Sequence, residues 1–208
     1  MLDARRGATV LLVALLLGST SLLPGPADGT DLALPPSAAP IFPAGAEDGV
    51  RLSRVYPQAA RDDEFVEITN WGSAAVDLTG WSLTDLEATA TFPGGTRVGP
   101  SARLVAARNS TSFAEDARRP ADFTYDRGDA RRMIGGVPRL ADTGDEVLLL
   151  DEVGSVIDAY VYGTSRYAGP GWAGPPAPAP GRGVVATRIP SADGRRDHDN
   201  ASDWQGIR

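Results

Sequence analysis

From Val50 onward, short stretches suited to extended structure alternate with sequences suited to tight turns. Apolar residues recur at every second position, as in Val66 and Ile68 or in Trp81 and Leu83, which is the period of a strand with one buried face. Glycine, proline, asparagine and aspartate separate these stretches, and these residues favour turns. Many short strands at such close spacing predict an all-β sandwich or barrel.

The pattern predicts where the strands lie. Residues 147–150 are apolar at every position, so we expect that strand to lie centrally in a sheet with both faces covered. The segment Asn109–Arg132 is polar and charged, and we expect a long surface insertion with one helical turn near Ser112–Asp116. The segments that we expect to be extended are Val50–Tyr56, Glu64–Asn70, Ala75–Leu78, Trp81–Asp85, Ala88–Phe92, Arg103–Ala107, Glu146–Asp151, Ser155–Tyr162 and Val184–Arg188.

The first residues have the order of a secretory signal. Arg5 and Arg6 precede a small and apolar run over Ala8–Leu17, and Pro24–Ala27 follows with residues that break helices. The apolar run is too short to span a bilayer comfortably. The competing interpretation is an uncleaved membrane anchor that extends to Leu23.

We therefore expect three parts. Residues 1–27 should be a signal peptide, residues 28–48 a disordered spacer rich in alanine, proline and aspartate, and residues 49–208 one folded domain with a proline-rich closing segment. This organisation predicts a secreted or cell-envelope protein, with a membrane contact only through an uncleaved leader.

Composition removes several kinds of chemistry. The chain has no cysteine, which excludes disulfides, thiolate metal sites and a cysteine nucleophile. All 20 basic residues are arginine, which excludes lysine-dependent chemistry. The net charge of −7 argues against a general nucleic-acid binder, since binding to phosphate chains needs a basic face. We expect a monomer whose partner is a protein, a cell surface or a polysaccharide.

A series of motifs resembles the lamin tail domain, the immunoglobulin-like module of nuclear lamins that also occurs in exported prokaryotic proteins. The resemblance covers about Val50 to Gly163 and implies an immunoglobulin-like β-sandwich. The segment Asn109–Arg132 departs from the compact family pattern. The motifs, in chain order, are Glu64–Asn70, Gly72, Val76–Asp85, Phe92–Thr96, Arg103–Ala106, Thr143–Asp151, Val156–Asp158 and Tyr162–Gly163.

The resemblance also bears on activity. Some similar proteins carry phospholipase D-like nuclease domains, whose chemistry needs paired histidines and lysines. This chain has one histidine and no lysine. It is therefore expected to be a non-catalytic binding or scaffolding module, with no cofactor. The alternative is an accessory domain of an exported nuclease or phosphodiesterase whose catalytic part is absent from this chain.

The densest polar cluster lies near the C-terminus. Asp197, Asp199, Asn200 and Asp203 offer oxygen ligands within seven residues and could hold calcium. The spacing fits no EF-hand loop, so an Asx-turn loop before Trp204 is the structural alternative. A metal-dependent hydrolase would further require a carboxylate from the sandwich to join these aspartates around one ion.

Two other features suggest a binding surface. Trp172 stands beside glycine and proline, and of the four tryptophans it is the leading candidate for an exposed binding residue, with packing against the sheet rim as the more common alternative. Trp81 should be buried. Positive charge concentrates in the insertion, where a contact with an anion is conceivable, although interleaved aspartates favour a self-neutralised surface. The candidate arginines there are Arg118, Arg119, Arg131 and Arg132.

Overall fold

The computed structural model describes residues 49–190 and 197–208. The expected signal peptide and spacer lie outside the described residues, as does part of the closing segment. No helix in the described part of the chain is both long enough and apolar enough to cross a membrane.

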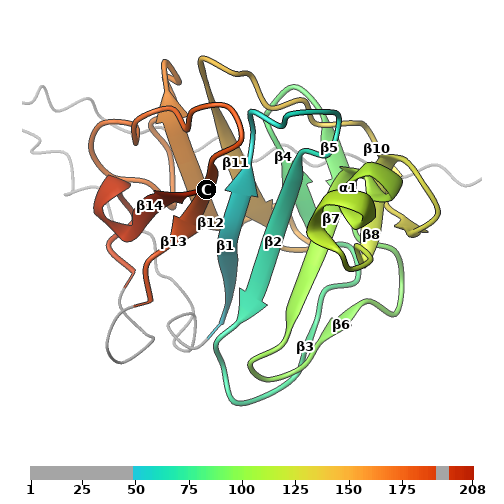
Figure 1. Ribbon diagram of the computed structural model, residues 1–208. Helices are drawn as coiled ribbons and strands as arrows, with labels where there is room; N and C mark the ends of the chain where they lie inside the picture. The colour runs from blue at the N-terminus through green and yellow to red at the C-terminus, as the bar shows by residue number, and fades with distance from the viewer. Residues whose placement is uncertain (1–48, 191–196) are drawn as a thin grey trace, which may run out of the picture. The chain divides into compact units, whose positions relative to one another are not determined.

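The larger of two main sheets has seven strands (Figure 1). Its strands pair antiparallel except at one edge, where β7, β8 and β9 run parallel. A β-bulge interrupts the pairing of β1 with β2 between Leu52 and Arg54. In spatial order the strands are β14 (Trp204–Ile207), β13 (Val185–Arg188), β1 (Val50–Tyr56), β2 (Phe65–Asn70), β7 (Arg103–Asn109), β8 (Phe123–Arg127) and β9 (Arg131–Arg132).

The smaller main sheet has five antiparallel strands. A separate two-stranded ribbon joins β3 (Val76–Asp77) to β6 (Arg97–Val98). In spatial order the strands of the five-stranded sheet are β10 (Ile134–Gly135), β5 (Thr89–Thr91), β4 (Ser82–Thr84), β11 (Gly144–Leu150) and β12 (Val156–Gly163).

The two main sheets form a sandwich with one apolar core between them. Leu52 and Ile68 from the larger sheet and Leu83 and Leu149 from the smaller one belong to the same buried cluster. Strand β11 is flanked by β4 and β12 and is buried on both faces over most of its apolar run, as predicted. Trp81 is only partly buried and packs against this core.

The insertion Asn109–Arg132 is not wholly a surface excursion. Helix α1 (Ser110–Ala117) begins at Asn109, whose side chain caps the first turn, and it lies over the outer face of the larger sheet (Figure 1). The chain then enters that sheet as β8, where Phe123 and Tyr125 are buried. The scattered aromatic residues therefore anchor a β7–α1–β8 crossover between parallel strands, which the polar composition concealed.

A proline-rich segment covers the outer edge of β12. We call Pro175–Pro180 the proline strap. Ala177 lies beside Tyr162 in a parallel bridge, donating its N–H to the carbonyl of Val161 and accepting from the N–H of Gly163, at 2.8 Å in both cases. The strap thereby continues the smaller sheet by a short extended segment and leads the chain toward β13.

Candidate functional site

The C-terminal aspartates begin with an ion pair rather than an open loop. Asp197 accepts a hydrogen bond from Arg188 of β13 at 2.8 Å, and its other oxygen lies 2.9 Å from Nε of Arg51 in β1. It also accepts from the N–H of Asp199 at 3.1 Å. The closing segment is therefore fastened to two neighbouring strands of the larger sheet by charge-assisted bonds.

A buried aspartate completes this cluster from the other sheet. Both carboxylate oxygens of Asp158, on β12, lie within hydrogen-bond distance of Nη2 of Arg188, at 2.6 and 2.7 Å, and one accepts from the N–H of Leu52 at 2.7 Å. Burial raises the pKa of Asp158 to about 6, although Arg188 acts in the opposite direction. At neutral pH the group is therefore ionised, and one guanidinium joins the two sheets and the closing segment.

Three of these carboxylates meet closely enough to suggest a cation site. Asp158, Asp197 and Asp199 each offer one oxygen, and these oxygens lie within 4.8 Å of one another. The sandwich thus does bring a carboxylate to the loop, as a metal-dependent hydrolase would require. The positive charges of Arg188 and Arg51 already contact this cluster, however. Because Ca²⁺ takes six to eight oxygen ligands, the arrangement fits an internal salt bridge better than a calcium site.

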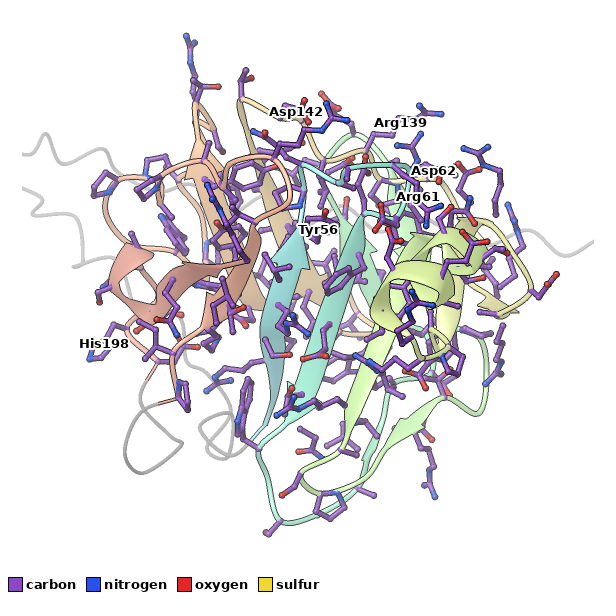
Figure 2. All side chains as sticks on the ribbon, in the orientation of Figure 1. Tyr56, Arg61, Asp62, Arg139, Asp142 and His198 are labelled. Carbon is purple, nitrogen blue, oxygen red and sulfur yellow. The ribbon has the colours of Figure 1, made fainter. Side chains whose placement is uncertain are left out.

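The other two residues of the predicted calcium set do not join the cluster. Asp203 is buried and accepts from the N–H of His198 at 2.8 Å, and its carboxylate lies 2.6 Å from Nδ1 of the same histidine. The side chain of Asn200 accepts from the N–H of Ser202 at 2.9 Å and caps a 3₁₀ helix over Ala201–Asp203. His198 lies at the outside of the molecule (Figure 2). The Asx-turn alternative describes this half of the loop.

Trp172 is a core residue, so it follows the packed alternative and not the exposed one. Only 7% of its surface is accessible, and its ring meets that of Tyr160 edge to face at 6.3 Å. Gly171 makes this possible, since it adopts a φ of +80° and lies against β12. Trp204 packs on the other side of the same region at 4.3 Å from Tyr160, beneath the guanidinium of Arg188. Trp172 therefore stabilises the closing segment and is not part of an aromatic binding surface.

The four candidate arginines of the insertion do not form one patch. Arg118 ends α1 in the left-handed conformation. Arg131 donates to a carbonyl in the loop between β5 and β6, and Arg132 donates to a carbonyl within β8. Arg119 alone reaches over the outer face of the larger sheet to the middle of β2. Only Arg119 therefore contributes to the groove described next.

A groove of 320 Å³ lies on that outer face, between α1 and β13; we call it the outer-face groove. Its floor is aromatic: Phe65 contacts Tyr56 and Phe113, with ring centroids 5.6 and 5.1 Å apart. Two arginines stack on this floor, Arg54 at 5.6 Å from the Phe65 ring and Arg119 at 5.5 Å from the Phe113 ring. The groove thus presents guanidinium groups held in place by aromatic rings.

Carboxyl groups form another part of the wall. Asp63 is buried and accepts from the N–H of Arg61 at 3.2 Å. Burial raises the pKa of Asp63, and the neighbouring Asp116 raises it further. Asp116 is itself paired with the guanidinium of Arg61 at 2.7 Å. The groove therefore combines free positive charge with hydrogen-bond acceptors.

The wall formed by α1 is fixed by the loop before β2. Asp62 accepts from Asn109 at 2.9 Å and from Ser112 at 2.7 Å, and these two hydrogen bonds lower its pKa. Arg61 and Asp62 lie beside α1, and Tyr56 lies at the end of β1 (Figure 2). The helix is thus held against the sheet from both its start and its side.

Sequence reasoning did not select Asp158, Arg54 or Asp63. Asp158 carried a usable signal, since it is a lone acidic residue in an otherwise apolar strand, and such a residue needs a buried partner. Arg54 carried no such signal, because arginine on a strand is ordinary until its neighbours are known.

The two sheets pack around one core as an immunoglobulin-like β-sandwich, and the C-terminal segment is tied to both sheets through Arg188. The sequence profile that matches is that of the lamin tail domain, over residues 43–164. The chain belongs to the lamin tail domain family.

A solved structure supports the fold. A crystal structure of a DUF4876 family protein from Bacteroides thetaiotaomicron VPI-5482 superposes with a TM-score of 0.56 at 13% identity, covering 77% of this chain and 71% of that one. At this identity the likeness extends to the fold alone. A comparison with curated proteins found no match.

Proposed function

We propose that this protein is a non-catalytic, exported module of the lamin tail domain type that binds or scaffolds. The observation that carries the proposal is the state of its buried carboxylates. In the described part of the chain, each accepts a hydrogen bond from a main-chain N–H or from an arginine. They are Asp63, Glu67, Asp85, Asp158 and Asp203. A carboxylate engaged in this way holds the fold and is poorly placed to exchange protons with a substrate.

Export is the second part of the proposal. It rests on the charged, apolar and breaker order of the first 27 residues. Folding in an extracytoplasmic compartment would require no disulfide from this chain, because the core and the salt bridge at Arg188 already join its two sheets.

Fractionation of a bacterial host that expresses the full chain tests export. The protein should be found outside the cytoplasm, and mass spectrometry should place its new N-terminus near Ala27. Recovery of the uncut chain from the cytoplasm alone would contradict export.

Assays of the purified protein test the absence of catalysis. It should hydrolyse neither a phosphodiester such as bis-(p-nitrophenyl) phosphate nor linear DNA, with or without calcium. Calcium should also leave the melting temperature unchanged, because Arg188 and Arg51 already neutralise the aspartate cluster. Turnover that is lost on replacement of Asp197 or Asp199 would overturn the proposal.

A further inference from the structure

Arg54 has an obvious partner that it does not use. In the β1–β2 ladder it stands directly opposite Glu67, a position at which opposite charges usually pair. Its guanidinium lies over the ring of Phe65 instead. Among the residues that the structure describes, no carboxylate lies within 4.0 Å of it. A half-buried arginine on the floor of a groove is thus left with its charge and its donors unused.

Glu67 explains why Arg54 is free. It is 1% exposed and already accepts from Ser53 at 2.9 Å and from Arg119 at 3.0 Å, and Arg103 lies at 4.0 Å. Two guanidinium groups, those of Arg119 and Arg103, are thus already directed at this one carboxylate, and the guanidinium of Arg54 is left without an acidic partner. At physiological salt, charges beyond about 8 Å are largely screened, so an anion at the groove responds chiefly to the unpaired guanidinium of Arg54 and its immediate neighbours.

The strands below the groove restrict the kind of ligand. β13, β1 and β2 are each paired on both sides, so their main-chain groups are taken. An extended peptide would find no free strand edge here to pair with. Recognition must come from side chains, which suits a ligand whose polar groups are hydroxyls and carboxylates.

The positive and negative side chains of the groove restrict the class of ligand further. A planar carboxylate matches the fork of an arginine in bidentate fashion. Asp116 is exposed at the groove and can accept a hydrogen bond, as a neighbouring sugar hydroxyl would require, while the buried Asp63 adds negative charge behind it. The same two groups would repel a phosphate more strongly than a singly charged carboxylate, because a phosphate monoester carries about −1.5 to −2 charges.

We propose that the outer-face groove binds an acidic polysaccharide of the uronate type, with the sugar carboxylate on Arg54 and Arg119 and an adjacent hydroxyl on Asp116. The groove's 320 Å³ lies at the small end of ligand sites, enough for one sugar unit of a chain that continues along the surface. This inference rests on the proposed binding function and names the ligand class for it.

Calorimetric titration of the full chain with oligogalacturonate tests the proposal. The wild type should bind, and the fully methyl-esterified oligomer should not, because it lacks the carboxylate. Arg54→Gln should weaken binding roughly ten-fold or more, the effect expected for hydrogen bonds to a charged group. Arg54→Lys keeps the charge but loses the planar fork of the guanidinium, so its affinity should lie between those of the wild type and Arg54→Gln.

Arg97→Gln is the matched control. It removes the same charge from the distant two-stranded ribbon, where Arg97 is 72% exposed, and it should leave the affinity unchanged. Unaltered melting temperatures would show that the variants are folded. If Arg54→Gln and Arg97→Gln weakened binding equally, the loss would reflect the net charge of the protein alone, and the proposed binding site would be contradicted.

Three other results would also overturn the inference. They are absence of binding by the wild type, equal binding of the esterified oligomer, and tighter, Arg54-dependent binding of poly-glutamate or polyphosphate. None of them bears on export or on hydrolysis, so a failure of this inference is distinguishable from a failure of the proposed function.

Discussion

Arg188 and Arg54 lie on adjacent strands of the same sheet and meet opposite fates. Arg188 faces the core, is 7% exposed in its side chain, and donates hydrogen bonds to two aspartates and to the carbonyl of Leu52, with a third aspartate, Asp203, at 3.9 Å. Arg54 faces outward and has only an aromatic ring beneath it. The comparison teaches that an arginine sealed between sheets must have all its donors satisfied, whereas one on an outer face can keep them for a ligand.

The largest effect should come from breaking the inner pair. Asp158→Ala leaves the buried charge of Arg188 without its closest partner and should lower the free energy of unfolding by about 3–5 kcal/mol. Urea denaturation followed by tryptophan fluorescence measures this, since Trp204 lies under the same guanidinium. A loss below about 1 kcal/mol would mean that water already reaches the pair.

A double variant separates lost charge balance from lost packing. Asp158→Leu combined with Arg188→Met removes both charges and should recover part of that stability, since apolar residues often replace a buried ion pair without cost, while the N–H of Leu52 and the carboxylate of Asp197 each lose a partner. Asp77→Ala, at an exposed pair 3.5 Å from Arg97, is the surface control and should change stability by about 0.5 kcal/mol or less.

The next effect concerns Glu67, the buried carboxylate beside the groove. Glu67→Gln weakens its bonds to Arg119 and Ser53 and should cost about 1–3 kcal/mol in a thermal or urea melt. It also frees Arg119, so affinity for oligogalacturonate should rise rather than fall. Weaker binding by a folded variant would show that Glu67 positions the arginines instead of competing for them.

A smaller, pH-dependent effect is expected at Asp62. Because its folded pKa is lowered, its contribution to stability is present above the unfolded value of about 3.9 and is lost as the pH falls through the folded pKa. The stability difference between wild type and Asp62→Asn should be about 1 kcal/mol at pH 7 and should shrink below pH 4. Denaturation curves across pH 3–7 measure this, and a constant difference would contradict it.

The smallest stability effect should come from Arg54 itself. Arg54→Gln loses only stacking on Phe65 and should change the free energy of unfolding by about 0.5 kcal/mol. This loss of stability should be far smaller than that caused by Asp158→Ala. A loss as large as that of the inner pair would give Arg54 a structural role.

The strands that could be predicted are those with a clear period and a turn at each end. β1 has the predicted limits Val50–Tyr56, and β2, β4, β11 and β12 differ from prediction by one or two residues at their ends. β8 was missed because it lies within the polar segment Asn109–Arg132, and β14 was missed because only the first of its four residues, Trp204, is buried.

The candidate sites were less predictable than the fold, for a related reason. Asp197 and Asp199 were recognised as neighbours in sequence, but the arginines that neutralise them come from β1 and β13. The glycine and proline around Trp172 suggested exposure, but Gly171 adopts a positive φ and the tryptophan ring packs against Tyr160 in the core. Local composition shows which groups are present, and only the tertiary fold shows which of them are already satisfied.

The proline strap has a consequence for how the molecule meets its own copies. An open strand edge is a template on which a second chain can add, and such addition leads to aggregation. At β12 the place of the added strand is already taken by Ala177. The next edge includes Pro178 and Pro180, which have no N–H to donate. The smaller sheet is therefore guarded on this side against edge-to-edge growth by a segment of the same chain.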